Sequence, residues 1–125
     1  MSELYCLVAG SRTFNDYDRF KSVMDEKLPV KEHITIVSGG AKGADALAER
    51  YAKEKGYHLV VIKADWDTYG KRAGYLRNEE MHKYISAHEN RMCICFWDGS
   101  SKGTQHNFGL SEKYHTNLII IRTNG

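Results

Sequence analysis

The sequence is poor in proline, and its positive and negative charges nearly balance. Pro29 is the only proline among 125 residues, and 42% of the residues are hydrophobic. This composition excludes a long disordered linker and favours one compact domain with a sizeable core. The formal net charge is only +2, and the lysines and arginines are spread along the chain. From the charge pattern we therefore expect nucleic acid to be an unlikely partner.

Long hydrophobic runs are also missing. No apolar stretch approaches the length of a membrane span, and Glu3 interrupts the N-terminal segment before a short hydrophobic run. A membrane-spanning helix and a signal peptide are not expected. The expected location is the cytoplasm.

Cysteine is scarce and odd in number. Cys6, Cys93 and Cys95 all fall within predicted strands. Reduced thiols in the core are a better interpretation than a disulfide framework. The Cys93-x-Cys95 spacing points both side chains the same way, but no second ligand pair accompanies it. We expect neither a metal site nor a cofactor.

Apolar runs and amphipathic segments alternate regularly along the chain. The predicted strands cover residues 5–9, 34–37, 58–62, 92–96 and 118–121. The predicted helices cover residues 16–28, 44–56, 71–86 and 103–114, and a loop is expected at Trp66 and Tyr69. Nearly continuous apolar strands between helices indicate a sheet buried on both faces. The predicted fold is α/β, a single Rossmann-like three-layer sandwich over residues 1–125 with a five-stranded, mostly parallel sheet.

A glycine-rich loop joins the second predicted strand to its helix. Gly39, Gly40 and Gly43 lie between the β-branched run 34–37 and the helix that begins at Ala44. Glycines at this position allow backbone N–H groups to approach an anion, and the helix start adds a positive dipole end. The loop therefore predicts a phosphate site, although such glycines also occur in plain tight turns.

Other polar loops are expected at the same rim of the sheet. They comprise residues 10–12 after the first strand, Trp66 and Tyr69 after the third, and residues 97–104 after the fourth. Ligands bind in such sheets beyond the carboxyl ends of the strands, near the switch point. The convergence favours a binding site over separate structural turns.

Several residues of this rim have two interpretations each. The Ser11 and Thr104 hydroxyls suit phosphate oxygens but are also typical of turns and caps. Arg12 is either a phosphate clamp or a surface charge. Asp45 either binds a ribose hydroxyl or stabilises the start of its helix. Trp66 either stacks on a base or packs against a helix.

The third long helix places an amide among apolar neighbours. Asn78 shares a predicted face with Met81 and Ile85, and Arg77 lies beside it. The partners of Asn78 are either protein groups or a bound sugar or phosphate. Glu80 is either a solvated charge or, if it faces the crevice, a general acid or base.

Five motifs are spread over almost the whole chain: Gly10-Ser11-Arg12, residues 38–45, Ala64-Asp65-Trp66, residues 70–81 and residues 98–104. Together they resemble the YspA/YpsA-related branch of the SLOG superfamily. The resemblance implies one SLOG-like domain that binds a nucleotide or a nucleotide-derived ligand. The ligand-binding residues expected from it and from the rim are Gly10, Ser11, Arg12, Ser38, Gly39, Gly40, Ala41, Gly43, Asp45, Trp66, Arg77, Asn78, Asp98, Ser101, Gly103 and Thr104.

The relatives differ in function, so three hypotheses stay open. The first is a sensor or sequestering domain for a nucleoside phosphate, ADP-ribose or an NAD-derived ligand. The second is a nucleotide N-glycosidase like the LOG phosphoribohydrolases, with Glu80, Asp45 or Asp98 as the catalytic carboxylate. LOG enzymes have a glutamate after their Gly-Thr segment, whereas this chain has Gln105 after Gly103 and Thr104. The third is single-strand DNA binding like that of DprA. Dimerisation is common among the relatives, so a homodimer is the expected assembly.

Overall fold

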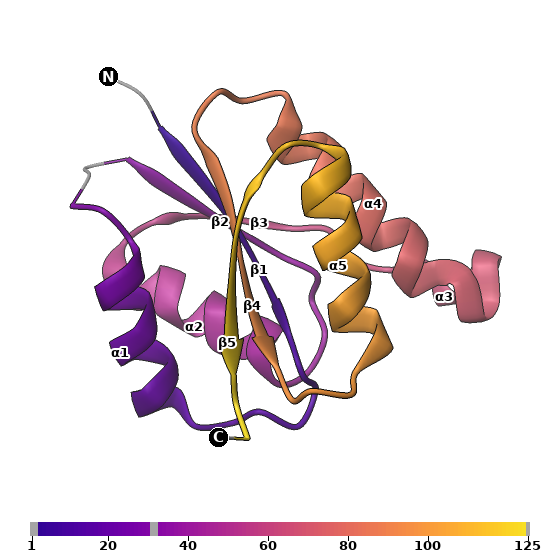
Figure 1. Cartoon of the computed structure of the whole chain (residues 1–125), viewed down its shortest axis with the longest axis horizontal. Coiled ribbons are helices and arrows are strands. Elements are labelled where there is room, and N and C mark those ends of the chain that lie inside the picture. Colours follow the sequence, from indigo (N-terminus) through magenta and orange to yellow (C-terminus); the bar gives the residue numbers. More distant parts are fainter. Residues whose placement is uncertain (1–2, 31–32, 125) are drawn as a thin grey trace.

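The computed structural model describes residues 3–30 and 33–124 as a five-stranded sheet with helices on both faces (Figure 1). The strands are β1 (Leu4–Gly10), β2 (Ile34–Ser38), β3 (His58–Val61), β4 (Arg91–Trp97) and β5 (Asn117–Arg122). The helices are α1 (Tyr17–Lys27), α2 (Ala44–Lys55), α3 (Trp66–Tyr69), α4 (Ala73–Ser86) and α5 (Lys102–Lys113), with a 3-10 turn, η1 (Gly70–Arg72), between α3 and α4.

The strand order is β3-β2-β1-β4-β5, and every pairing in the described sheet is parallel. The predicted α/β sandwich is confirmed. Its sheet, which was predicted to be mostly parallel, is fully parallel in the described residues. The chain first builds outward from β1 to β3 and then returns to β4 on the other side of β1. The switch point of the sheet therefore lies between β1 and β4.

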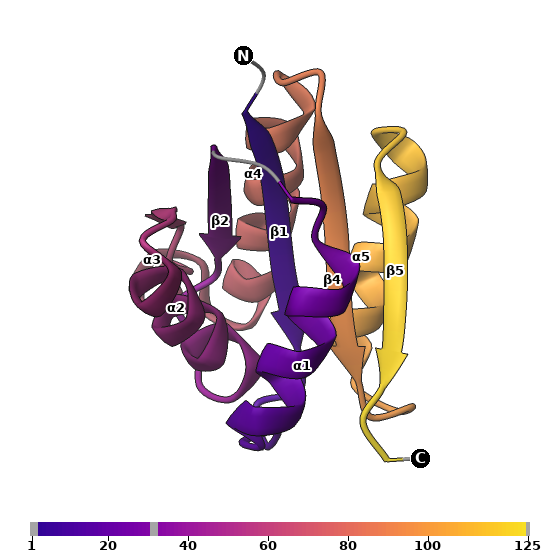
Figure 2. The same ribbon diagram turned by 90° about the vertical axis from the view of Figure 1, so that its left-hand side faces the viewer.

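Two apolar layers fill the space between the sheet and its helices. One core joins α1 and α2 to the sheet, around the fully buried Phe20, Met24 and Tyr51. The other lies on the α4 side, where Met81 and Ile85 meet Leu7 of β1. Figures 1 and 2 show the two helix layers on opposite faces. The central strands are the most apolar because both of their faces are covered.

Local signals set the helix ends. The Asp16 side chain accepts a hydrogen bond from the Arg19 N–H and caps α1, and Gly56 ends α2 in the left-handed region. The structure differs from the prediction at residues 66–69, where a helical turn replaces the expected loop. Its cause is Asp65, whose carboxylate accepts a hydrogen bond from the Thr68 N–H.

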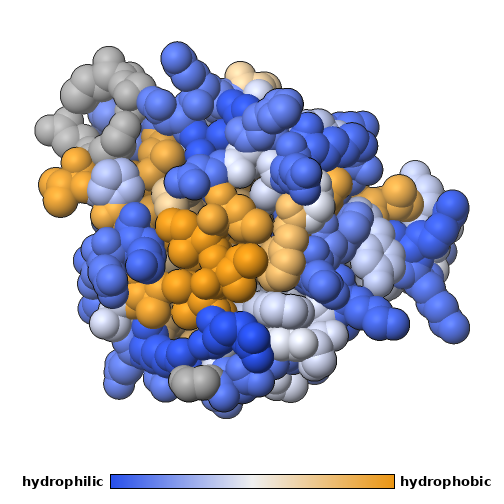
Figure 3. All heavy atoms as spheres, in the orientation of Figure 1, coloured by the Kyte–Doolittle hydropathy of each residue, from blue (hydrophilic) through white to orange (hydrophobic). Residues whose placement is uncertain are grey.

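The three cysteines are free and fully buried, as predicted. No described helix is both long and apolar enough for a membrane span. The edge strand β5 is less covered than the central strands. Ile120 on this strand is 43% exposed, and Figure 3 shows apolar side chains gathered over this edge.

Candidate functional site at the switch point

A cavity of about 420 Å³ opens at the carboxyl ends of the central strands. Below we call it the main cavity. It is bordered by the segments that follow β1, β2 and β4 and by one face of α4. Its lining residues are Ala9, Gly10, Ser11, Arg12, Thr13, Ala41, Asp45, Trp66, Lys71, Gly74, Tyr75, Arg77, Asn78, Met81, Asp98, Ser101, Gly103, Thr104 and Asn107.

The position of the main cavity follows from the topology. Residues 11–13 follow β1, and residues 98–101 join β4 to α5. These two connections leave the sheet on opposite faces and separate at the switch point, so a crevice opens between them. The predicted convergence of polar loops at one rim is therefore present in the structure.

Close contact between two loops fixes the floor of the site. The Ala44 N–H donates to the Ser11 carbonyl oxygen at 3.1 Å. Gly43 has a φ of 73°, and a side chain there would overlap the backbone of Ser11 and Arg12. Only glycine combines this backbone angle with such an approach. The role of Gly43 in the structure is to let the β1–α1 and β2–α2 loops pack together.

The side chains of Asp45 and Arg77 both lie against Gly39. A Cβ on Gly39 would lie 2.9 Å from Asp45 Oδ2 and 2.8 Å from Arg77 Nη1. Arg77 donates from Nη1 to the Gly39 carbonyl oxygen at 2.7 Å and from Nε to Asn78 Oδ1 at 3.0 Å. The guanidinium is thus held at the rim of the cavity by its own chain.

The Asp45 carboxylate is almost completely buried, with 6% of the residue exposed. Burial raises its pKa to about 6, although the Ala41 N–H and the charge of Arg77 act in the opposite direction. Desolvation disfavours the charged form of a carboxyl group. Asp45 is therefore a cavity carboxyl group that titrates near neutral pH.

Asp98 has a different environment. Its Oδ1 accepts hydrogen bonds from the N–H groups of Ser100 and Ser101 at 2.9 and 2.7 Å, and its Oδ2 accepts one from the Ser11 hydroxyl at 3.4 Å. The backbone donors lower the pKa of Asp98. Asp98 thus ties the β4–α5 loop together and links it to the β1–α1 loop.

Asn78 has protein partners. Its amide donates to the Gly103 carbonyl oxygen at 3.2 Å and lies 3.4 Å from His106 Nδ1, while its oxygen accepts from Arg77. The residue is 4% exposed. Of its two interpretations, the structure therefore shows protein hydrogen bonding, which joins α4 to α5 beneath the cavity.

Aromatic and cationic side chains form the outer rim. The Arg12 guanidinium lies 5.5 Å from the ring centre of Trp66, which is 47% exposed. Tyr75 packs edge-on against His106, with ring centres 4.8 Å apart. A flat group entering the cavity meets exposed aromatic faces on the α3–α4 side.

Most of the predicted binding residues line the main cavity. The structure shows where the other predicted residues lie. Gly39 and Gly40 line a neighbouring cavity instead. Ser38 is buried beneath the loop, where its hydroxyl donates to the Asp45 carbonyl oxygen and accepts from the Gly40 N–H. Gly43 is covered by the β1–α1 loop, as described above. Glu80 is exposed on α4 and lines neither cavity.

The glycine loop differs from the simple phosphate cradle that its sequence predicts. The Gly40 N–H donates to Ser38 Oγ, and the Ala41 N–H donates to Asp45 Oδ2, each at 3.2 Å. These two donors already have internal acceptors. An anion beside this loop therefore cannot use these two N–H groups without replacing their present acceptors.

Some lining residues were missed by the sequence analysis. Tyr75 precedes Asn78 by about one helical turn and Lys71, in η1, by about two. Asn107 follows Thr104 by about one turn of α5. Helical periodicity applied to the known site residues would have found them. Thr13, whose hydroxyl lies 2.8 Å from Ser11 Oγ, had no signal beyond its nearness to Arg12.

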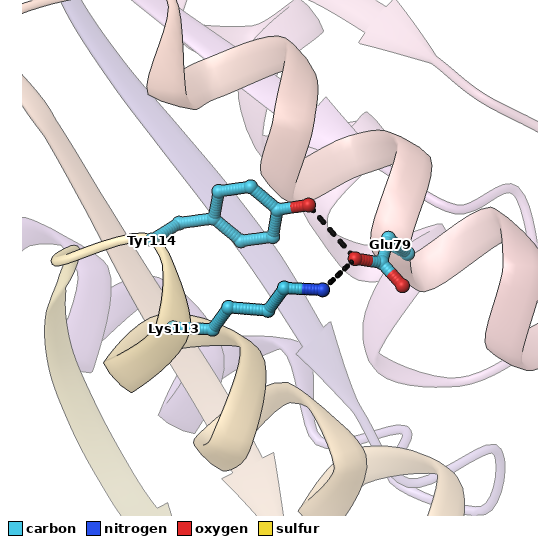
Figure 4. Close-up of polar contacts among 3 residues, drawn as sticks. All are labelled: Glu79, Lys113 and Tyr114. Carbon is cyan, nitrogen blue, oxygen red and sulfur yellow. Dashed lines mark hydrogen bonds and ion pairs between the residues drawn. The ribbon is translucent and has the colours of Figure 1, made fainter.

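An ion pair outside the cavity fixes the two helices behind it. Glu79 of α4 accepts hydrogen bonds from Lys113 Nζ at 2.6 Å and from Tyr114 Oη at 2.8 Å (Figure 4). These two donors lower the pKa of Glu79 to about 2. The contact joins the middle of α4 to the end of α5.

The fold and the position of the main cavity define the class of this protein, a Rossmann-like domain with a crevice at its switch point. The chain belongs to the YspA, cpYpsA-related SLOG family, whose sequence model matches residues 6–69. It is 35% identical to the Gene 61 protein of Mycobacterium phage D29 over 106 residues, which cover 80% of this chain and 82% of the phage protein. The resemblance drawn from the motifs is confirmed.

Solved structures with this fold include two DNA processing proteins. The single-stranded DNA-binding DNA processing protein A from Helicobacter pylori matches with a TM-score of 0.69 and 19% identity, over 95% of this chain and 65% of that chain. DprA from Streptococcus pneumoniae matches with a TM-score of 0.66 and 17% identity, over 94% of this chain and 50% of that chain. This chain thus spans less than two thirds of either protein.

These matches correct one expectation. The balanced overall charge led us to expect nucleic acid to be an unlikely partner. That deduction is wrong, because the Helicobacter pylori protein, which shares this fold, binds single-stranded DNA. Overall charge is a poor guide where cations are concentrated locally.

Proposed function

We propose that the main cavity binds a nucleotide or a nucleotide-derived ligand, such as a nucleoside phosphate, ADP-ribose or an NAD-derived molecule, as a sensor or sequestering domain. The observation that carries this proposal is the composition of the cavity at the switch point. It combines the guanidinium groups of Arg12 and Arg77, the hydroxyls of Ser11 and Thr104, and the exposed ring of Trp66. Cations and hydroxyls suit a phosphate, and an exposed ring suits a base.

Asp45 has a place in this binding mode. It lies deeper than the rim cations, and its ionised form accepts hydrogen bonds only. A ribose hydroxyl would be a suitable donor to it. Binding through this contact should strengthen as the pH rises through about 6, since the carboxylate is the better acceptor.

A nucleotide N-glycosidase is the second candidate, and Asp45 favours it. A general base acts best when its pKa lies near the working pH, and burial brings the pKa of Asp45 to about 6. Asp98 is engaged by the N–H groups of Ser100 and Ser101, and Glu80 is exposed outside the cavity. Of the three carboxylates considered from sequence, Asp45 is the one we assign to water activation in this reaction.

A mass-spectrometric screen tests both candidates together. The purified protein is incubated with nucleoside monophosphates, ADP-ribose, cyclic ADP-ribose and NAD, and both retained ligand and released base are measured. Retention of an intact ligand supports a sensor or sequestering domain. Base release that is lost in Asp45→Asn supports the glycosidase. If no nucleotide is retained or cleaved, the proposed function is wrong.

A further inference from the structure

A second cavity of about 530 Å³ adjoins the main cavity. Its charged lining residues are Arg12, Lys42, Lys63 and Arg77, and none of the described residues that line it is acidic. We call it the basic cavity. The main cavity, in contrast, contains the carboxylates of Asp45 and Asp98. A local concentration of one charge sign favours an anion.

The two cavities adjoin one another. Arg12, Ala41, Trp66 and Arg77 line both of them. A ligand that occupies the main cavity and extends past Trp66 therefore reaches the basic cavity without leaving the protein surface. Arg12 and Trp66 lie at this junction, with the guanidinium carbon 5.5 Å from the ring centre.

The chain neutralises these cations poorly by itself. Within the described residues, Lys42 and Lys63 form no ion pair. The stem of Lys63 lies over the glycine loop, since a Cβ on Gly40 would be 3.0 Å from Lys63 Cγ. Burial lowers the pKa of Arg77; the charge of Asp45 opposes this change, and the charge of Arg12 adds a smaller lowering. An anion beside the guanidinium would offset the loss of its hydration.

We propose that the basic cavity is a second anion subsite, which takes a further phosphate of the ligand whose nucleoside part occupies the main cavity. This inference rests on the proposed function and narrows it. The ligand then carries a second phosphate at a different position from the first. Two sources provide that chemistry: a mononucleotide phosphorylated at two positions, and nucleotides joined by a phosphodiester.

The test compares AMP, adenosine 3′,5′-bisphosphate and the 5′-phosphorylated dinucleotide pApA by isothermal titration calorimetry. For the wild-type protein we expect at least one of the two-phosphate ligands to bind about tenfold or more tightly than AMP, as one further charge-assisted contact implies. A gain for the bisphosphate alone identifies a mononucleotide. A gain for the dinucleotide identifies a phosphodiester chain.

The decisive variant is the double substitution Lys42→Gln and Lys63→Gln. It should remove the gain from the second phosphate and leave the AMP affinity within about twofold, because Lys42 and Lys63 do not line the main cavity. The double substitution Lys53→Gln and Lys83→Gln, at exposed positions of α2 and α4, is the control for the loss of two positive charges. Circular dichroism confirms the fold of each variant.

Two outcomes overturn the second subsite while leaving the proposed function intact. In one, AMP binds and neither two-phosphate ligand binds more tightly. In the other, the gain survives in the Lys42→Gln, Lys63→Gln double variant. If none of the three nucleotides binds, the adenine-nucleotide form of the proposed function fails first, and the second subsite fails with it.

Discussion

The main cavity and the basic cavity meet at Arg12 and Trp66, yet their chemistry differs. The main cavity mixes cations with hydroxyls, amides and the carboxylates of Asp45 and Asp98. The basic cavity has four cations and, among its described lining residues, no carboxylate. A mixed lining distinguishes the parts of a ligand by hydrogen bonds, whereas a lining of one sign selects chiefly for charge. We therefore assign recognition of the nucleoside to the first and of a further phosphate to the second.

The largest effect is expected from Gly43→Ala, which breaks the shared floor of the site. The added Cβ would overlap the Ser11 carbonyl oxygen, and the φ of 73° adds strain. We expect a loss of about 3 kcal/mol or more in the free energy of unfolding, measured by urea denaturation. Gly109→Ala is the matched control, since nothing lies within 4 Å of its added Cβ. That change in α5 should be neutral or stabilise by about 0.5–1 kcal/mol.

Asp45→Asn removes one of the two carboxylates that distinguish the main cavity from the basic cavity. The folded state raises the pKa of Asp45 from 3.8 to about 6, so ionisation costs stability as the pH rises through this range. The penalty is absent below about pH 4 and complete above about pH 6. The free energy of unfolding of the variant is compared with that of wild type at two pH values. From pH 4 to pH 8, this difference should shift in favour of the variant by up to about 3 kcal/mol. A stability difference between variant and wild type that does not change with pH would contradict the raised pKa of Asp45.

Arg77→Ala removes a side chain that both cavities share. The loss of one charged hydrogen-bonding group should weaken AMP binding about 10- to 100-fold, measured by calorimetry. Unlike the Lys42→Gln, Lys63→Gln double variant, Arg77→Ala should weaken the binding of AMP and of adenosine 3′,5′-bisphosphate alike. In an enzyme it should also reduce turnover at saturating substrate. Unchanged binding and activity would remove Arg77 from the site.

The smallest effect is expected from Glu79→Gln, at a residue that lines neither cavity. The folded state lowers the pKa of Glu79 from 4.5 to about 2, so its bonds to Lys113 and Tyr114 stabilise the protein above about pH 4.5. Thermal unfolding should show a slightly lower Tm for the variant at pH 7, with the difference fading between pH 4.5 and 2. Nucleotide affinity should not change. A large loss of affinity would mean that the α4–α5 contact controls the cavity.

The sequence predicts the fold well because its signals are local. β-branched runs and helical periodicity place every strand and all the long helices, and α3 is missed because a four-residue helix has too few residues to show a period.

The site is predicted less completely. Glycine motifs identify the β2–α2 loop, but they do not show that the Gly40 N–H is already bonded to Ser38. The basic cavity was missed because Lys42 and Lys63 are brought together by the parallel pairing of β2 with β3, which no local pattern encodes.

The most direct test of the main cavity as a nucleotide site is an amide ¹H–¹⁵N NMR titration of the full chain with AMP and, in parallel, with ADP-ribose. With at least one of them, we predict chemical-shift changes concentrated at Ser11, Ala41 and Thr104, around the switch point, and little change in α1 on the opposite face of the sheet. If neither nucleotide shifts these amides at millimolar concentration, or if the changes lie elsewhere on the molecule, the central claim is wrong.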